Sequence, residues 1–234
     1  MWANRAAVLL AIVVLGWPFS VSAQQSHGSF LSKLQIEPIP GTERDFQLLS
    51  DFAYRDPQDR MWTAPKGAIV DGASIPRAFR LLFGGPWDGR YKEASVIHDH
   101  FCKTKSRPWQ DVHRSFYSAM RANGVDETKA KLMFAAVYRF GPRWTGENES
   151  FKVCSRELAE QRAVSFEDTL AMCNDPRSGR GRLVWMPEES DADWASLVTA
   201  TNGGAALADI ATLVTRQLDA EPEAKQLRAR RLID

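Results

Sequence analysis

The sequence predicts an α+β protein in which a small antiparallel sheet packs on a helical hairpin plus a third helix, with a C-terminal helical extension. Three observations predict this fold class. Apolar and polar residues alternate in short runs between residues 30 and 75, as in half-buried strands. Apolar residues then recur at helical spacing from residue 91 to 138, and again from 194 to 218. Strands followed by helices are typical of segregated α+β architectures.

The composition is that of an ordinary globular protein, with 44% apolar and 25% charged residues among 234. Lysines and arginines number 30 against 29 aspartates and glutamates. A dedicated nucleic-acid binder needs a clear basic excess to neutralise phosphates, so we expect no nucleic-acid partner.

The first element is a secretory signal, predicted for residues Met1–Ala23. Arg5 precedes the apolar run 6–15, and Val21-Ser22-Ala23 gives a small-residue cleavage pattern. The apolar run is shorter than the roughly 20 residues that a membrane-spanning helix needs. We therefore expect cleavage after Ala23, an exported protein that is periplasmic or secreted, and no transmembrane segment after cleavage.

The strands of the small antiparallel sheet come next, separated by turn residues such as Pro40-Gly41 and Asp56-Pro57. Alternating patterns predict strands over residues 34–37, 46–48, 52–54, 60–64 and 68–70. Asp71 follows the last of these strands. It either holds a turn with Gly72 or supplies a carboxylate to a site at the strand end.

Three amphipathic helices follow. The first presents an apolar face from Tyr91 to Cys102, and the second begins near Pro108 and ends at Asn123-Gly124. The third has Asp126 as its expected N-cap. Because the connections are short, consecutive helices are expected to lie antiparallel and side by side.

The composition changes after Trp144, which divides the chain into a signal at 1–23, an α+β domain at 24–147 and a C-terminal extension at 148–234. A last helix is expected from Trp194 to Leu218, interrupted at Gly203-Gly204. The charged end from Glu221 is expected to fray.

An oxidising compartment favours one disulfide among the three cysteines. Cys154 and Cys173 lie close in sequence, and closing that loop stabilises by roughly 3 kcal/mol in the chain-entropy picture. We therefore expect a Cys154–Cys173 disulfide and a free Cys102, with the other pairings remaining open.

The residues that can carry chemistry gather on the first two helices. His98 lies on the apolar face of the first helix, one turn before Cys102, and His113 lies on the apolar face of the second. An antiparallel pair brings these faces together, and Asp99 is displaced by about 100° from His98, at the edge of the same face. Asp111 is expected to be solvated.

A site of His98, Asp99, Cys102 and His113 supports two chemistries. Two imidazoles with a carboxylate or thiolate suit a divalent metal, Zn²⁺ more than Ca²⁺, which can activate a water. Without a metal, Asp99 can orient His98 as a general base. The alternative is a structural network in which the two histidines satisfy each other in the core.

Four ordered motifs resemble a bacterial and phage family known as domain of unknown function 1353, over about residues 45–144. In that family's pattern the His-Asp pair is followed by a Tyr three residues later, where Cys102 stands here. An acidic residue of the pattern is replaced by His113. The motifs are Pro65 to Arg77, Tyr91 to Asp99, Phe116 to Met120 and Phe140 to Trp144.

The resemblance implies that His98, Asp99 and Asp71 are the family's shared residues in this chain. It implies no established activity, and it implies a phage-derived or envelope-associated protein. A weaker resemblance, to the His-Asp helix of secreted phospholipases A2, would make His98 a base and Asp99 a Ca²⁺ ligand, although the chain lacks that family's Tyr and dense disulfides. Two functions are therefore expected as alternatives. One is an exported hydrolase-like or metal-binding domain centred on His98 and Asp99. The other is a non-catalytic envelope or phage-derived accessory protein with a buried His-Asp-His network.

Overall fold

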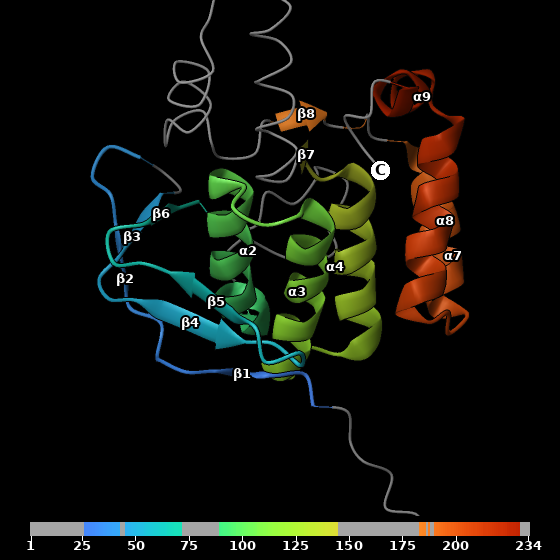
Figure 1. Ribbon diagram of the computed structural model, residues 1–234. Coiled ribbons are helices and arrows are strands. Elements are labelled where there is room, and N and C mark those ends of the chain that lie inside the picture. The colour runs from blue at the N-terminus through green and yellow to red at the C-terminus, as the bar shows by residue number, and fades with distance from the viewer. Residues whose placement is uncertain are drawn as a thin grey trace, which may run out of the picture.

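The computed structural model describes residues 26–42, 45–71, 89–144, 183–185, 187 and 190–229 (Figure 1). The predicted signal at 1–23 and the predicted Cys154–Cys173 disulfide lie outside the described residues. The fold class is confirmed as α+β, with short antiparallel strands on one side of three consecutive helices and further helices on the other (Figure 1).

The strands form two three-stranded antiparallel sheets where the sequence predicted one. One sheet has the order β1-β4-β5 and the other β2-β3-β6. The split arises at Leu48, whose N–H donates to Ala68 and whose carbonyl accepts from Gly67, so β3 pairs with β6 and not with the following β4. The strands are β1 (Ser29–Phe30), β2 (Ile36–Pro38), β3 (Phe46–Leu48), β4 (Phe52–Arg55), β5 (Met61–Ala64) and β6 (Ile69–Val70).

Strand β5 displays the predicted alternation most clearly. Trp62 and Ala64 are fully buried, whereas Met61 and Thr63 face outward. The Trp62 ring meets Phe101 of the first long helix edge to face, with ring centres 4.9 Å apart. This contact joins the β1-β4-β5 sheet to the helices through a buried aromatic pair.

The three central helices are α2 (Lys92–Thr104), α3 (Trp109–Ala122) and α4 (Glu127–Phe140), preceded by the 3-10 turn η1 (Gly89–Tyr91). Their bounds match the predicted helices closely. Asp126 caps α4 as expected, because its carboxylate accepts from the Lys129 N–H at 3.0 Å. The helix α2 packs against α3, and α3 packs against α4, as short connections require.

The C-terminal helices pack against α4. The expected interruption is confirmed, since α7 (Asp191–Asn202) and α8 (Leu207–Ala220) are separated at Gly203-Gly204. The expectation of a frayed end from Glu221 is wrong, because α9 (Pro222–Ala229) forms there and buries Ala224 completely.

A short sheet completes the described structure, with β7 (Arg143–Trp144) pairing antiparallel to β8 (Leu183–Trp185). Among the helices of the described segments, none combines the length and apolarity needed to cross a membrane.

Candidate metal centre between two helices

The candidate site lies in the seam between α2 and α3, where two histidines and a cysteine converge. His98 and Cys102 are four residues apart on α2, so their side chains lie one above the other on the same face. The turn between the helices holds Lys105 in a left-handed conformation (φ 53°) and lets α3 return alongside α2. His113, in the second turn of α3, therefore faces His98.

The three side chains are within reach of one another. His98 Nε2 lies 2.8 Å from His113 Nδ1. Cys102 Sγ lies 3.6 Å from His98 Nε2 and 3.8 Å from His98 Nδ1. All three ligand atoms of the group fall within 4.8 Å of one another. The convergence of the two imidazoles that the sequence predicted is thus present.

The hydrogen-bond partners assign a tautomer to each ring. The Pro142 carbonyl can only accept, so His113 donates to it through Nε2–H at 3.2 Å. His113 Nδ1 must then accept from the Nε2–H of His98, which leaves His98 Nδ1 as an acceptor facing the Cys102 thiol. The result is a directed chain of neutral groups from the thiol to a backbone carbonyl.

Burial keeps every member of this chain neutral. Desolvation lowers the pKa of His98 to about 3. Desolvation, followed by the nearby His98 and Arg143, holds the pKa of His113 well below its ordinary value. Burial, followed by the charge of Asp99, raises the pKa of the Cys102 thiol. Both imidazoles are therefore neutral at neutral pH, as metal ligands must be. Metal binding through His98 Nε2 requires that its proton moves to Nδ1, the other tautomer of the ring.

Aromatic rings enclose the two histidines. Phe116 lies against His98 with ring centres 4.7 Å apart, and Trp109, Tyr138 and Trp144 surround His113 at 5.7 to 6.3 Å. His113 is fully buried and His98 nearly so, whereas Cys102 is only partly buried. Any approach to the site among the described residues is therefore on the Cys102 side.

The donor set fits a thiophilic divalent ion. In tetrahedral Zn²⁺ sites the nitrogen ligands lie about 3.3 Å apart and a nitrogen and a thiolate sulfur about 3.6 Å apart. The observed 3.6 Å between Cys102 Sγ and His98 Nε2 matches the second separation. The 2.8 Å between the two imidazole nitrogens must widen by about half an ångström to meet the first. Ca²⁺ prefers oxygen ligands and does not suit this set.

The Asp99 side chain points away from the three-donor group that the sequence predicted it would join, and toward Asp71 and Lys103. Its carboxylate accepts from the Asp71 N–H at 2.8 Å and lies 3.4 Å from the Lys103 ammonium. Lys103 also lies 3.0 Å from the Asp71 carboxylate, at the end of β6. Three of the four expected metal donors therefore come together, while Asp99 joins Asp71 in a separate acidic pair bound to a lysine.

The two carboxyls of this pair differ in acidity. Burial, together with the negative charge of Asp71, raises the pKa of Asp99 to about 7. Burial also opposes ionisation of Asp71, but hydrogen bonds from Lys103 and Asp99 outweigh it and lower its pKa. The Lys103 ammonium supplies the positive charge beside both carboxylates.

The sequence reasoning missed two groups around α3. The Pro142 carbonyl, which fixes the tautomer of His113, is a backbone atom that no motif reveals. Asp111, expected to be solvated, is partly buried and binds Arg60 at 3.0 Å. Its spacing with Ser115 and Ser118, a polar stripe on α3, was the available signal.

Comparison with known proteins gives a family but no activity. Residues 46–137 match a family described as "Protein of unknown function (DUF1353)". The chain is 47% identical over 144 residues to the uncharacterized protein y4jT of Sinorhizobium fredii, covering 61% of this chain and 43% of that protein. It is 36% identical over 184 residues to the uncharacterized protein y4iH of the same organism, covering 71% of this chain and 77% of that protein. No solved structure gives a significant match.

Proposed function

We propose, from the premise that the chain belongs to the DUF1353 family of proteins of unknown function, that it binds a thiophilic divalent metal ion, foremost Zn²⁺, through His98, Cys102 and His113. The observation that carries the proposal is the convergence of these three side chains within 4.8 Å. Both imidazoles are neutral, and the 3.6 Å between Cys102 Sγ and His98 Nε2 equals the separation in a tetrahedral site.

The two departures from the family pattern support this reading. That pattern has a Tyr where Cys102 stands and an acidic residue where His113 stands. Both replacements exchange an oxygen-bearing side chain for a sulfur or nitrogen donor. Both new donors lie within 4 Å of His98, the residue that the chain shares with the pattern. Such a pair of exchanges favours a softer metal ion.

Three protein donors leave one position of a tetrahedral ion for a water molecule. A Zn²⁺ ion with an open position lowers the pKa of its bound water and supports hydrolysis at neutral pH. On this proposal Cys102, the least buried donor, marks the side from which a substrate approaches. His113 is held in orientation by the Pro142 carbonyl, which serves as its outer-shell partner.

The test is metal binding by the purified protein and three single variants. We expect Zn²⁺ to be retained at one equivalent per chain, and Co²⁺ added after chelator treatment to give a thiolate-to-cobalt absorption. Cys102→Ser abolishes that absorption and His113→Ala weakens metal binding at least about 100-fold. His100→Ala is the matched control, because His100 lies on α2 outside the three-donor group and leaves binding unchanged.

A non-catalytic role is the second candidate, favoured by the completeness of the hydrogen-bond chain. From Cys102 to Pro142 each polar atom has a partner without any metal. In that case the protein holds no stoichiometric metal, and His98→Ala and His113→Ala both lower the free energy of unfolding, because each leaves a buried partner unsatisfied. Metal retained by the wild type and lost in both variants, with the fold preserved, rules this candidate out.

We further propose that the protein is exported, as the predicted signal over residues 1–23 implies. The test is expression of the full chain in a Gram-negative host, with cell fractionation and mass measurement. A periplasmic product beginning at Gln24 supports export. A cytoplasmic product that retains Met1 or Trp2 contradicts it.

A further inference from the structure

A cavity of about 690 Å³ lies on the side of α3 away from the His98 face. This α3 pocket is formed by five parts of the chain: the segment before β1, the turn between β4 and β5, and residues of α3, α4 and α8. Its volume falls in the range of small-molecule sites. Its lining residues are Ser26, His27, Asp56, Pro57, Gln58, Arg60, Asp111, Arg114, Ser115, Tyr117, Ser118, Glu127, Lys131, Ala206 and Leu207.

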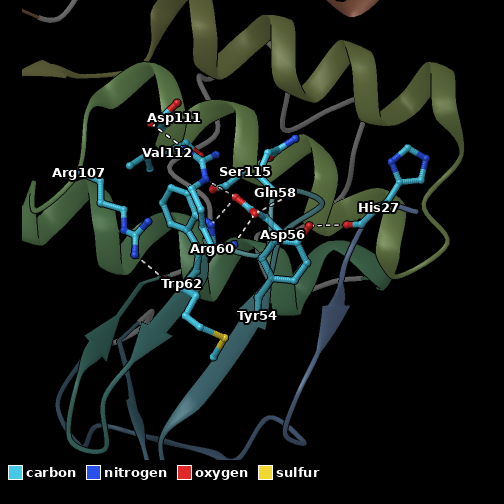
Figure 2. A network of polar contacts seen from close by, with 11 residues as sticks. His27, Tyr54, Asp56, Gln58, Arg60, Trp62, Arg107, Asp111, Val112 and Ser115 are labelled. Atoms are coloured by element: carbon cyan, nitrogen blue, oxygen red, sulfur yellow. Dashed lines mark hydrogen bonds and ion pairs between the residues drawn. The ribbon is translucent and has the colours of Figure 1, made fainter. Parts of the chain in front are cut away.

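A rigid polar network forms one wall of the α3 pocket (Figure 2). The buried Asp56 carboxylate accepts from the backbone N–H groups of Gln58 and Arg60, both at 2.9 Å. Its other oxygen accepts from Trp62 Nε1 at 2.9 Å and from Arg60 Nε at 2.7 Å. All of its capacity is thus used inside the protein, and it fixes the turn that carries Gln58 into the pocket.

Helix α3 forms the second wall of the α3 pocket, and Arg60 joins it to this network. Its guanidinium bridges from Asp56 to Asp111, at 3.0 Å, and thereby connects the β4–β5 turn to α3 (Figure 2). Lys131 pairs with Glu127 at 2.8 Å across one turn of α4. These contacts pair five of the charged side chains in the lining and leave them poorly available to a ligand.

Arg114 is the cation of the α3 pocket that stands apart from these pairs. Within the described segments its guanidinium lies within 4.0 Å of no carboxylate, and it donates only to the Tyr138 hydroxyl at 3.3 Å. The Tyr138 ring also supports it from 5.5 Å. Because the guanidinium makes only this one neutral hydrogen bond, its remaining N–H groups face solvent. Two parallel N–H groups of a guanidinium can bind the two oxygens of a carboxylate.

The rest of the lining is neutral and rich in hydrogen-bonding groups. Gln58, Ser26 and Ser118 supply an amide and hydroxyls, and the rings of His27 and Tyr117 lie edge to face with centres 6.2 Å apart. Such groups bind hydroxyls, while the aromatic rings cover the apolar faces of a ligand.

We propose that the α3 pocket binds a small hydroxylated organic acid, of the sugar-acid class, with its carboxylate on Arg114 and its hydroxyls toward Gln58 and Ser118. A single carboxylate matches Arg114, which lacks the acidic partner that the other two cations of the lining, Arg60 and Lys131, have among the described residues. A neutral, hydroxyl-bearing remainder matches the amide, hydroxyl and aromatic lining. The proposal does not depend on the candidate metal centre, whose residue His113 lies on the opposite face of α3.

The test is calorimetric titration of the full-length protein with D-glucuronate, D-glucose and acetate as probes. We expect D-glucuronate to bind at one site per chain, and D-glucose, which lacks the carboxylate, to bind at least tenfold more weakly. Acetate, which lacks the hydroxyls, is expected to bind at least tenfold more weakly as well. Equal binding of either partial probe overturns the assignment, as does the absence of D-glucuronate binding at millimolar concentration.

Variants then separate the contribution of Arg114 to binding from any effect on folding. Arg114→Gln is expected to weaken D-glucuronate binding at least tenfold, and Arg114→Lys, which keeps the charge but loses the fork, to weaken it less. Arg216→Gln is the matched control, since Arg216 is exposed on α8 and does not line the pocket. Unchanged binding in Arg114→Gln contradicts the proposal. Because Arg114 is itself exposed, its variants are expected to keep the wild-type circular dichroism spectrum.

Discussion

Asp56 illustrates how a single buried carboxylate can organise a surface. It accepts four hydrogen bonds, from Trp62, the Arg60 guanidinium and two backbone amides. Burial by itself raises its pKa, but the hydrogen bonds from Trp62 and Arg60 outweigh burial, so the pKa lies below its ordinary value. The ionised form is therefore the one that the folded protein stabilises.

Replacing Asp56 should accordingly cost much of the stability of the sheet–helix junction. We expect Asp56→Asn to lower the free energy of unfolding at pH 7 by about 3 kcal/mol, because the amide loses the charge and opposes the donors of Arg60 and Trp62. Asp59→Asn, in the same turn but exposed and with a φ of 61° that Asn tolerates, is the control and should change little. Urea unfolding measures both.

The lowered pKa of Asp56 also predicts how the wild type responds to acid. Since the folded pKa lies below the ordinary 3.8, this stabilisation is fully present above pH 3.8 and is lost as the pH falls through the folded value. The stability difference between wild type and Asp56→Asn should therefore shrink below about pH 4. A difference that stays constant from pH 7 to pH 3 would show that the carboxylate charge is not the source.

At the level of helices and strands, the sequence pattern predicts an element correctly where the residues that define it lie close together in the chain. The bounds of α2, α3 and α4 could be predicted because apolar spacing, Pro108 and the Asp126 cap all lie within each helix. The division of the strands into two sheets could not, since it depends on which distant segment uses the hydrogen-bonding groups of Leu48. Helix α9 was missed because a charged sequence shows no apolar stripe.

The same distinction applies to the candidate site. The contact between His98 and His113 could be predicted, because both residues lie on apolar helix faces and a short connection brings these faces together. The direction of Asp99 did not follow, because its partner Asp71 comes from the end of β6. The α3 pocket draws on five separate parts of the chain, so no single run of residues pointed to it.

Helix α4 ends at a glycine whose missing side chain leaves room for the His113 ring of the candidate metal centre. An ideal Cβ on Gly141 would lie 2.2 Å from the Val137 carbonyl oxygen and 3.1 Å from His113 Cε1. We expect Gly141→Ala to destabilise the protein by about 1–3 kcal/mol and to weaken metal binding, because the helix end and the His113 ring must both shift.

The matched control is Gly203→Ala, at the end of α7. Both glycines follow a helix with a φ near −75°, but a Cβ on Gly203 would come no closer than 3.2 Å to its nearest neighbour. Thermal unfolding and Co²⁺ titration of the two variants make the comparison. Equal effects on both properties would contradict a specific role for the space at Gly141.

At the scale of the whole molecule, the buried cation Arg139 ties the C-terminal helices to α4. Arg139 of α4 is 1% exposed and forms ion pairs with Asp193 of α7, at 2.5 Å, and with Glu221 at the end of α8. A buried guanidinium that lost both carboxylates would be left without compensation, so these helices are held in place electrostatically as well as by packing.

Removing only the cation should therefore loosen the C-terminal helices from α4. We expect Arg139→Met to lower the free energy of unfolding by about 3 kcal/mol and to speed amide hydrogen exchange in α7 and α8 more than in α2 and α3, because two partly buried carboxylates are left facing each other. The triple variant Arg139→Met, Asp193→Leu, Glu221→Leu removes all three charges and should regain most of the lost stability. A triple variant as unstable as the single variant would contradict this expectation. The C-terminal helices would then depend on the ion pairs themselves, because apolar contacts alone would not hold them against α4.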